Sequence, residues 1–131
     1  IRYVKQKVES GVDFLTTQMC FDNDIHYNFL YRIREAGINV PVLPGIMPMT
    51  SEKQMKRSQE LSGTVFPRRF LALLDRFGSS AAAMEQAGIA YATDQIIDLL
   101  SNGVNNIHIY TMNKPHVAAA IMNNLSEIIK A

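Results

Sequence analysis

The chain has 131 residues, 47% of them hydrophobic, with a formal net charge of +1 and one cysteine. This length allows one domain with a buried core, and the near-neutral charge gives no electrostatic case for a nucleic-acid or membrane partner. A single cysteine excludes an internal disulfide framework and suits a reducing compartment such as the cytoplasm. No apolar run is long enough to span a membrane, and no signal peptide is visible.

Helical and strand-like patterns alternate along the chain. The chain starts at Ile1, inside a helical pattern with no strand before it, so we expect a piece of a longer chain. The predicted elements are, in order, a helix over 1–10, a strand over 14–21, a helix over 25–36, a strand over 40–43, a helix over 51–61, a short strand over 63–66, helices over 68–77 and 81–101, a strand over 106–112 and a helix over 115–130. The candidates for the buried side of the helix over 25–36 are Tyr27, Leu30, Tyr31 and Ile33.

The segment VPVLPGIMP, residues 40–48, holds three of the five prolines. Its apolar first part predicts a buried strand. Pro44 has no amide hydrogen, so we expect this strand to stop near Leu43. Gly45 lets the chain turn, or lets a ligand approach the backbone. A stiff loop between a strand and a helix can carry a ligand or can be purely structural, and local sequence leaves both open.

Strands separated by helices predict an α/β fold with a parallel sheet and right-handed crossovers. Two architectures fit this order. One is a self-contained open sheet with helices on both faces, and the other is four consecutive units of a TIM (β/α)8 barrel. The leading helix without a preceding strand favours the barrel piece. In a barrel piece we expect the strands to pair in sequence order, 14–21 with 40–43, 40–43 with 63–66, and 63–66 with 106–112.

The carboxyl ends of parallel strands are where ligands bind. These predicted ends are rich in amides and hydroxyls, and Asp22 is their only carboxylate. Gln18 offers two donor hydrogens and an acceptor oxygen in one plane, which suits the edge of a flat heterocycle. A strand glutamine bonded to a neighbouring loop is the structural alternative. The set comprises Thr17, Gln18, Asp22, Pro44, Gly45, Ile46, Pro67, Tyr110, Thr111, Met112 and Asn113.

The remaining reactive side chains favour structural roles. His108 is expected to be a packed or half-exposed strand residue, and His26 and His116 to be surface residues. No pair of histidines has metal-ligand spacing, so no metal site is predicted. Cys20 is interpreted as a buried core thiol. The basic side chains of two predicted helices indicate a solvated face: Lys53, Lys56, Arg57, Arg68 and Arg69.

Three stretches taken together resemble the carboxyl-terminal half of methylenetetrahydrofolate reductases. They are KVESGVDFLTTQMCFD, PVLPGIMPM and NNIHIYTMNK, in that order. The family pattern is a lysine-containing helix, an "AGA…TQ" strand, a "PGI.P" strand and a final "HFYTLNR" strand. Each motif alone is weak, but all three in order form a fairly specific signal that covers the whole chain.

The resemblance implies the carboxyl-terminal, four-stranded half of a TIM barrel that binds FAD and reduces 5,10-methylenetetrahydrofolate to 5-methyltetrahydrofolate. A reduced nicotinamide is the implied electron donor. Gln18 matches the TQ glutamine, which contacts the folate pterin and lies by the flavin. Lys7 matches a flavin-contacting lysine, and Tyr3 and Gln6 fall at neighbouring cofactor positions with different residue types. Gln54 matches a folate-contacting glutamine of bacterial members.

Two departures from the family pattern concern the folate. Lys114 stands where the family has arginine, which keeps the charge but loses the planar fork. Ser58 stands where some bacterial members carry an aromatic that packs on the folate. The acidic catalytic residues of the family lie in the amino-terminal half, so we expect no catalytic residue here and an inactive isolated chain whose partner is the missing half of the barrel.

Two other interpretations remain open. A non-catalytic half barrel could bury its open sheet edges against a second copy as a homo-oligomer, because unpaired parallel strands expose apolar ladders. An unrelated small α/β binding domain with a chance proline loop is the third. Flavin absorbance would separate an enzyme from a scaffold.

Overall fold

The computed structural model describes residues 11, 14–19, 21–62, 66–110 and 114–130, with only the backbone for residues 18, 19 and 62. The predicted helix over 1–10 lies outside the described residues. The described elements are β1 (Leu15–Met19), α2 (Asn23–Glu35), β2 (Val42–Ile46), α3 (Glu52–Ser62), α4 (Arg68–Phe77), α5 (Ala81–Ser101), β3 (His108–Ile109) and α6 (Pro115–Asn124).

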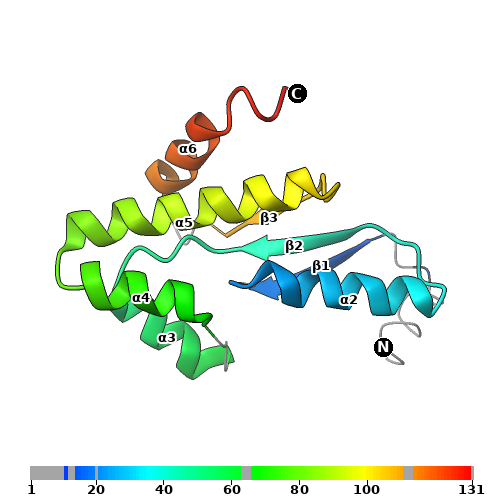
Figure 1. The fold of residues 1–131 in the computed structure, drawn as a ribbon, viewed down its shortest axis with the longest axis horizontal. Helices are drawn as coiled ribbons and strands as arrows, with labels where there is room; N and C mark the ends of the chain where they lie inside the picture. The colour runs from blue at the N-terminus through cyan, green and yellow to red at the C-terminus, as the bar shows by residue number, and fades with distance from the viewer. Residues whose placement is uncertain (1–10, 12–13, 20, 63–65, 111–113, 131) are drawn as a thin grey trace.

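The three described strands form one parallel sheet in the order β1-β2-β3, so β2 is the central strand. The prediction of an α/β fold with parallel strands is confirmed. Figure 1 shows α2 and α5 running along the strands, while α3 and α4 gather beyond the carboxyl end of β2 and α6 lies outside α5. The loop that follows β2 therefore runs directly into the region between the sheet and these helices.

The predicted stop of the central strand near Leu43 is wrong, because β2 continues through Pro44 and Gly45 to Ile46. The sheet accommodates the proline through a register shift in β1 between Thr16 and Met19. At this irregularity the Gly45 amide donates to the Thr17 side-chain oxygen at 3.0 Å, in place of a regular ladder bond. A proline is tolerated in a central strand when a bulge removes the need for its missing donor.

The predicted pairing of the strand over 63–66 between the central strand and the last strand is also wrong. Gly45 pairs with His108 and Ile46 with Ile109, so β2 bonds β3 directly. A strand has only two edges, and β1 occupies the other one. Residues 63–65 lie outside the described part of the chain, and Phe66 is a buried loop residue.

The helices follow their capping signals. The spans predicted for α4 and α5 are confirmed at both ends. The Ser80 hydroxyl caps α5 by accepting from the Ala83 amide at 3.3 Å, and the Asp22 carboxylate caps α2 by accepting from the Asp24 amide at 3.0 Å. The last helix is shorter than predicted, because α6 ends at Asn124 and hydrogen-bonded turns follow.

Two expectations about α2 are wrong. His26 was expected at the surface, but only 3% of it is exposed, because it lies on the side of the helix that faces inward with Ile33. Tyr31 was expected on the buried side, but 70% of it is exposed. Helix periodicity explains both, because residues 26 and 33 are two turns apart on one face and residue 31 lies away from it.

The core contains three clusters of buried side chains. One surrounds Phe21, Met49, Phe66 and Phe70, beyond the carboxyl end of the sheet. A second lies between β2, α5 and α6, and a third between α2 and the amino-terminal ends of the strands. The first cluster anchors the loop between β2 and α3, residues 47–51, which we call the proline loop. Its residues Met47, Met49 and Thr50 are all buried.

Candidate functional site

The rim cluster, defined as Thr50, Gln54 and Lys114, lies where the loop after β2 meets the starts of α3 and α6. The Lys114 ammonium donates to the Thr50 hydroxyl oxygen at 3.0 Å. The Gln54 side-chain oxygen accepts from the Thr50 hydroxyl and from the Thr50 backbone amide, both at 3.1 Å. Gln54 and Lys114 were predicted as site residues from the sequence, and the structure joins them through the buried Thr50.

Gln54 also has a structural role at the start of α3. The Ser51 hydroxyl accepts from the Gln54 backbone amide at 3.1 Å, while the Gln54 side chain reaches back to the Thr50 amide. This reciprocal arrangement is a capping box displaced by one residue, and it ties the proline loop to the helix. The Gln54 side-chain amide nitrogen points to the Pro48 carbonyl oxygen at a long 3.4 Å.

The first and last described strands reach the same rim. The Tyr110 backbone amide donates to the Ile46 carbonyl at 2.9 Å, and its hydroxyl to the Thr17 carbonyl at 3.4 Å. Tyr110 thus crosses β2 to the strand that carries Gln18, whose backbone lies one residue before the end of β1. The side chain of Gln18 is not described. Tyr3, Gln6, Lys7 and Asn113 lie outside the described residues.

Close packing holds the proline loop in place. A Cβ atom on Gly88 of α5 would lie 1.8 Å from the Met49 carbonyl oxygen, so only glycine allows this approach of helix and loop. Ser58, at the position where some family members carry an aromatic residue, is buried and directs its hydroxyl to the Met47 sulfur at 4.0 Å. Its side chain therefore packs into the core.

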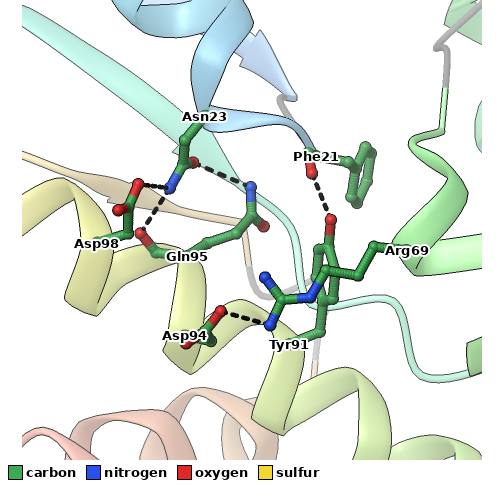
Figure 2. A network of polar contacts seen from close by, with 7 residues as sticks. All are labelled: Phe21, Asn23, Arg69, Tyr91, Asp94, Gln95 and Asp98. Carbon is green, nitrogen blue, oxygen red and sulfur yellow. Dashed lines mark hydrogen bonds and ion pairs between the residues drawn. The ribbon is translucent and has the colours of Figure 1, made fainter.

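A second polar region, the interhelical cleft, lies between α2, α4 and α5 and encloses about 340 Å³. Figure 2 shows its contacts. The Asn23 side-chain nitrogen donates to the Asp98 carboxylate at 2.8 Å and to the Gln95 backbone carbonyl at 3.0 Å. The Asn23 side-chain oxygen accepts from the Gln95 side-chain nitrogen at 3.2 Å. These bonds tie the start of α2 to the middle of α5.

The other side of the interhelical cleft holds a cation and an aromatic ring. The Arg69 guanidinium forms an ion pair with the Asp94 carboxylate at 2.8 Å and lies 5.7 Å from the centre of the Tyr91 ring. The Tyr91 hydroxyl donates to the Phe21 carbonyl at 2.6 Å. Arg69 was predicted to be a solvated helix residue, and it is exposed while making these contacts.

The pKa values of Tyr27, Asp98 and His26 are shifted. Burial and a hydrogen bond to Asp98 raise the pKa of Tyr27 to about 12. The Asn23 amide and the Tyr27 hydroxyl, which donates at 2.8 Å, hold the pKa of the Asp98 carboxyl below its usual value. Burial lowers the pKa of His26, whose Nε2 atom has no hydrogen-bond partner among the described residues.

Neither Thr50 nor the interhelical cleft was predicted from the sequence. The bond from Lys114 to Thr50 spans 64 positions, which no local pattern predicts. His108 is exposed at the surface beside the Tyr110 ring, and His116 is exposed near Glu85.

Within the described ranges, no three His, Cys, Asp or Glu side chains come together as a metal site would need. None of the described helices has both the length and the apolar character of a membrane span.

Parallel strands joined by helices, with polar side chains meeting beyond the strand ends, define an α/β protein whose site lies at the carboxyl edge of its sheet. The family model described as "Methylenetetrahydrofolate reductase" matches residues 1–126. The chain belongs to this family, which confirms the resemblance of its three motifs.

Known relatives agree with this assignment. "Methylenetetrahydrofolate reductase (NADH) 1" of Arabidopsis thaliana is 34% identical over 128 residues, which are 98% of this chain and 22% of the relative. "5,10-methylenetetrahydrofolate reductase" of Escherichia coli is 30% identical over 122 residues, 93% of this chain and 41% of the relative. "Probable methylenetetrahydrofolate reductase (NADPH)" of Caenorhabditis elegans is 32% identical and is covered over 19% of its length. The chain thus spans less than half of each.

One solved structure has a similar fold. It is described as an uncharacterised protein from Clostridium thermocellum that binds two copies of 5-methyl-5,6,7,8-tetrahydrofolic acid. The match has a TM-score of 0.61 at 17% identity and covers 92% of this chain and 45% of the other. At this identity the likeness shows the fold alone.

Proposed function

We propose that this chain is a segment of a methylenetetrahydrofolate reductase that reduces 5,10-methylenetetrahydrofolate to 5-methyltetrahydrofolate through a bound FAD. Membership of the family supports the reaction, and relatives named for NADH or NADPH support a reduced nicotinamide as electron donor. We place the protein in the cytoplasm, since a single cysteine suits a reducing compartment. The observation that carries the folate assignment is the rim cluster, which joins Gln54 to Lys114.

The described strands fit consecutive strands of the carboxyl-terminal half of a (β/α)8 barrel. They are parallel and adjacent in the order of the sequence, as barrel strands are. Among the described residues, β1 and β3 each pair on one edge only, and strands from the rest of a longer chain would cover the other edges. In this proposal the 131 residues act as one unit that is inactive without that remainder.

The side chains at the rim suit the folate. Lys114 carries a positive charge that no acidic side chain within the described ranges pairs, since none of the salt bridges involves it. The Gln54 amide nitrogen adds a donor beside it. Such donors bind carboxylate and carbonyl oxygens, both of which folates carry. Gln18 would contact the pterin edge from the neighbouring strand.

The flavin would supply the reducing electrons when bound. Tyr3, Gln6, Lys7 and Gln18 would hold it, and the one of these with a described backbone, Gln18, lies at the carboxyl end of β1. That position is at the rim where barrels of this class bind ligands, so it fits a cofactor placed over the strand ends. Gln18 would then orient the folate against the flavin.

Stopped-flow kinetics of the complete protein test this proposal. Gln18→Ala should slow folate reduction more than flavin reduction, because a paired amide is lost from the folate side at a cost of about 1–3 kcal/mol. Equal losses in both half-reactions would make Gln18 a structural residue. A complete protein that carries no flavin and reduces no folate would refute the proposed function itself.

The isolated 131 residues provide a second measurement. They should bind FAD weakly or not at all, because most of the cofactor site would belong to the rest of the chain. A yellow protein with one flavin per 131-residue chain would contradict the proposal that this segment needs its missing half.

A further inference from the structure

The hydrogen bonds of the rim cluster run in one direction only. A lysine ammonium has three donors and no acceptor, so the Thr50 hydroxyl oxygen must accept the bond from Lys114 at 3.0 Å. The hydroxyl proton is then available for the Gln54 side-chain oxygen, 3.1 Å away. The charge of Lys114 thus determines the direction of the Thr50 hydroxyl.

The same bonds determine how the Gln54 carboxamide is turned. Its oxygen accepts from both the hydroxyl and the backbone amide of Thr50, so it faces the loop. Its nitrogen points to the Pro48 carbonyl of the same loop at a long 3.4 Å, and its second N–H has no partner among the described residues. Carboxamide orientation follows from the network of donors and acceptors around it. Exchanging the oxygen and nitrogen would direct the Gln54 NH2 group at the Thr50 backbone N–H. Donor would then face donor, which is unfavourable.

Thr50 is well placed to anchor flexible partners. Only 4% of it is exposed, and its neighbour Met49 is buried against Gly88 of α5. A free lysine side chain has many rotamers, and ordering it costs conformational entropy. The Thr50 hydroxyl holds the Lys114 ammonium in one place, so this entropy is already lost before a ligand binds. Ligand binding is favoured as a result.

We propose that Thr50 is a positioning residue that orients Lys114 and Gln54, so that this part of the rim offers only donors and binds a hydrogen-bond acceptor. The acceptor is a carboxylate or carbonyl oxygen of the folate, and this identity rests on the proposed function. In this proposal the acceptor takes hydrogen bonds from the remaining N–H groups of Lys114 and Gln54.

A double-mutant cycle in the complete protein tests the role of Thr50. Thr50→Val removes the hydroxyl at nearly constant volume and should weaken 5-methyltetrahydrofolate binding about tenfold, whereas Thr50→Ser should keep it within about twofold. In a Lys114→Met background, Thr50→Val should cost clearly less, because the ammonium is gone and only the orientation of Gln54 is left to lose. An equal loss in both backgrounds would overturn the proposal, as would unchanged binding in Thr50→Val.

Gln54→Glu tests the donor character of the rim. The glutamate keeps an oxygen for both Thr50 bonds and preserves the helix cap, but it removes both side-chain N–H groups and adds negative charge. Binding of 5-methyltetrahydrofolate should weaken by about tenfold or more, with the unfolding midpoint in urea unchanged. Tighter or unchanged binding would overturn the assignment of an acceptor.

A crystal structure of the Thr50→Val variant separates this inference from the proposed function, because it needs no ligand. We expect the Lys114 ammonium to leave its position and the Gln54 carboxamide to lose its fixed orientation. Both side chains unmoved would overturn the positioning role even in a protein that binds folate. A wild-type protein that binds no folate would refute the proposed function and leave this structural test valid.

Discussion

The rim cluster and the interhelical cleft both gather polar side chains beyond the sheet, yet they differ in how their charges are compensated. In the cleft, Asp94 pairs with Arg69, and Asp98 accepts from Asn23 and Tyr27. At the rim, Lys114 is held by a neutral hydroxyl and its charge remains uncompensated within the described residues. Charges that are paired internally stabilise a fold, whereas an ordered but unpaired cation is suited to a ligand.

The two regions also differ in what supports them. Hydrogen bonds between helices hold the cleft, whereas close packing of a buried loop against α5 holds the rim. Substitutions at the cleft should therefore affect stability and leave ligand binding unchanged. Substitutions at the rim should affect ligand binding and leave stability unchanged, except those that displace the loop, which should also lower stability.

The largest effect is expected for Gly88→Ala, which places a methyl group against the Met49 carbonyl. The free energy of unfolding of the complete protein should fall by about 2–3 kcal/mol, despite the better helix propensity of alanine. Urea titration measures it, and Ala90→Ser on the exposed side of α5 should change it by no more than about 0.5 kcal/mol. Equal stability of Gly88→Ala and wild type would mean that the loop does not rest on α5.

A smaller effect is expected at the interhelical cleft. Asp98→Ala removes the acceptor of Asn23 and Tyr27 and should lower the free energy of unfolding by about 1 kcal/mol. Asp98→Asn keeps one acceptor oxygen and should recover part of this loss. Both variants should bind 5-methyltetrahydrofolate as the wild type does, and weakened binding in either would show that the cleft belongs to the site.

Alkaline pH tests the Tyr27 contact. The pKa of Tyr27 is about 12 in the folded protein and near 10 in the unfolded chain, so its contribution is complete below pH 10 and is lost as pH rises towards 12. The urea midpoint of the wild type should therefore fall more steeply between pH 10 and 12 than that of Tyr27→Phe. Parallel curves for the two proteins would contradict the raised pKa.

The smallest effect is expected for the Arg69–Asp94 ion pair. Its side chains are 72% and 54% exposed, so solvent screens the attraction. Arg69→Ala should lower the free energy of unfolding by about 0.5 kcal/mol or less, and added salt should reduce the difference further. A loss several times larger would show that the contact with the Tyr91 ring carries most of the stabilisation.

The sequence predicted the features that local patterns determine. The spans of α4 and α5 follow from apolar periodicity with Ser80 as cap, and the parallel α/β order follows from alternating elements. It did not predict that β2 passes through Pro44, because this depends on a side chain of another strand, Thr17. His26 was misplaced because its position in α2 did not reveal which face is buried.

The candidate site was predicted in part and for a specific reason. Gln54 and Lys114 were selected through the resemblance to the reductase family, and both lie in the rim cluster. Thr50 was missed because its importance arises from a tertiary contact between the proline loop and the start of α6. The interhelical cleft was missed because Asn23, Gln95 and Asp98 form ordinary helix surfaces until α2 and α5 pack together.

Titration of the complete protein with 5-methyltetrahydrofolate tests most directly whether the rim, and not the cleft, holds the folate. Lys114→Ala should weaken binding about tenfold, since it removes a charged hydrogen bond, while Lys114→Arg should keep or improve it. Asp98→Ala should leave the dissociation constant within about twofold of the wild-type value. Unchanged binding in Lys114→Ala, or a loss confined to Asp98→Ala, would contradict the account.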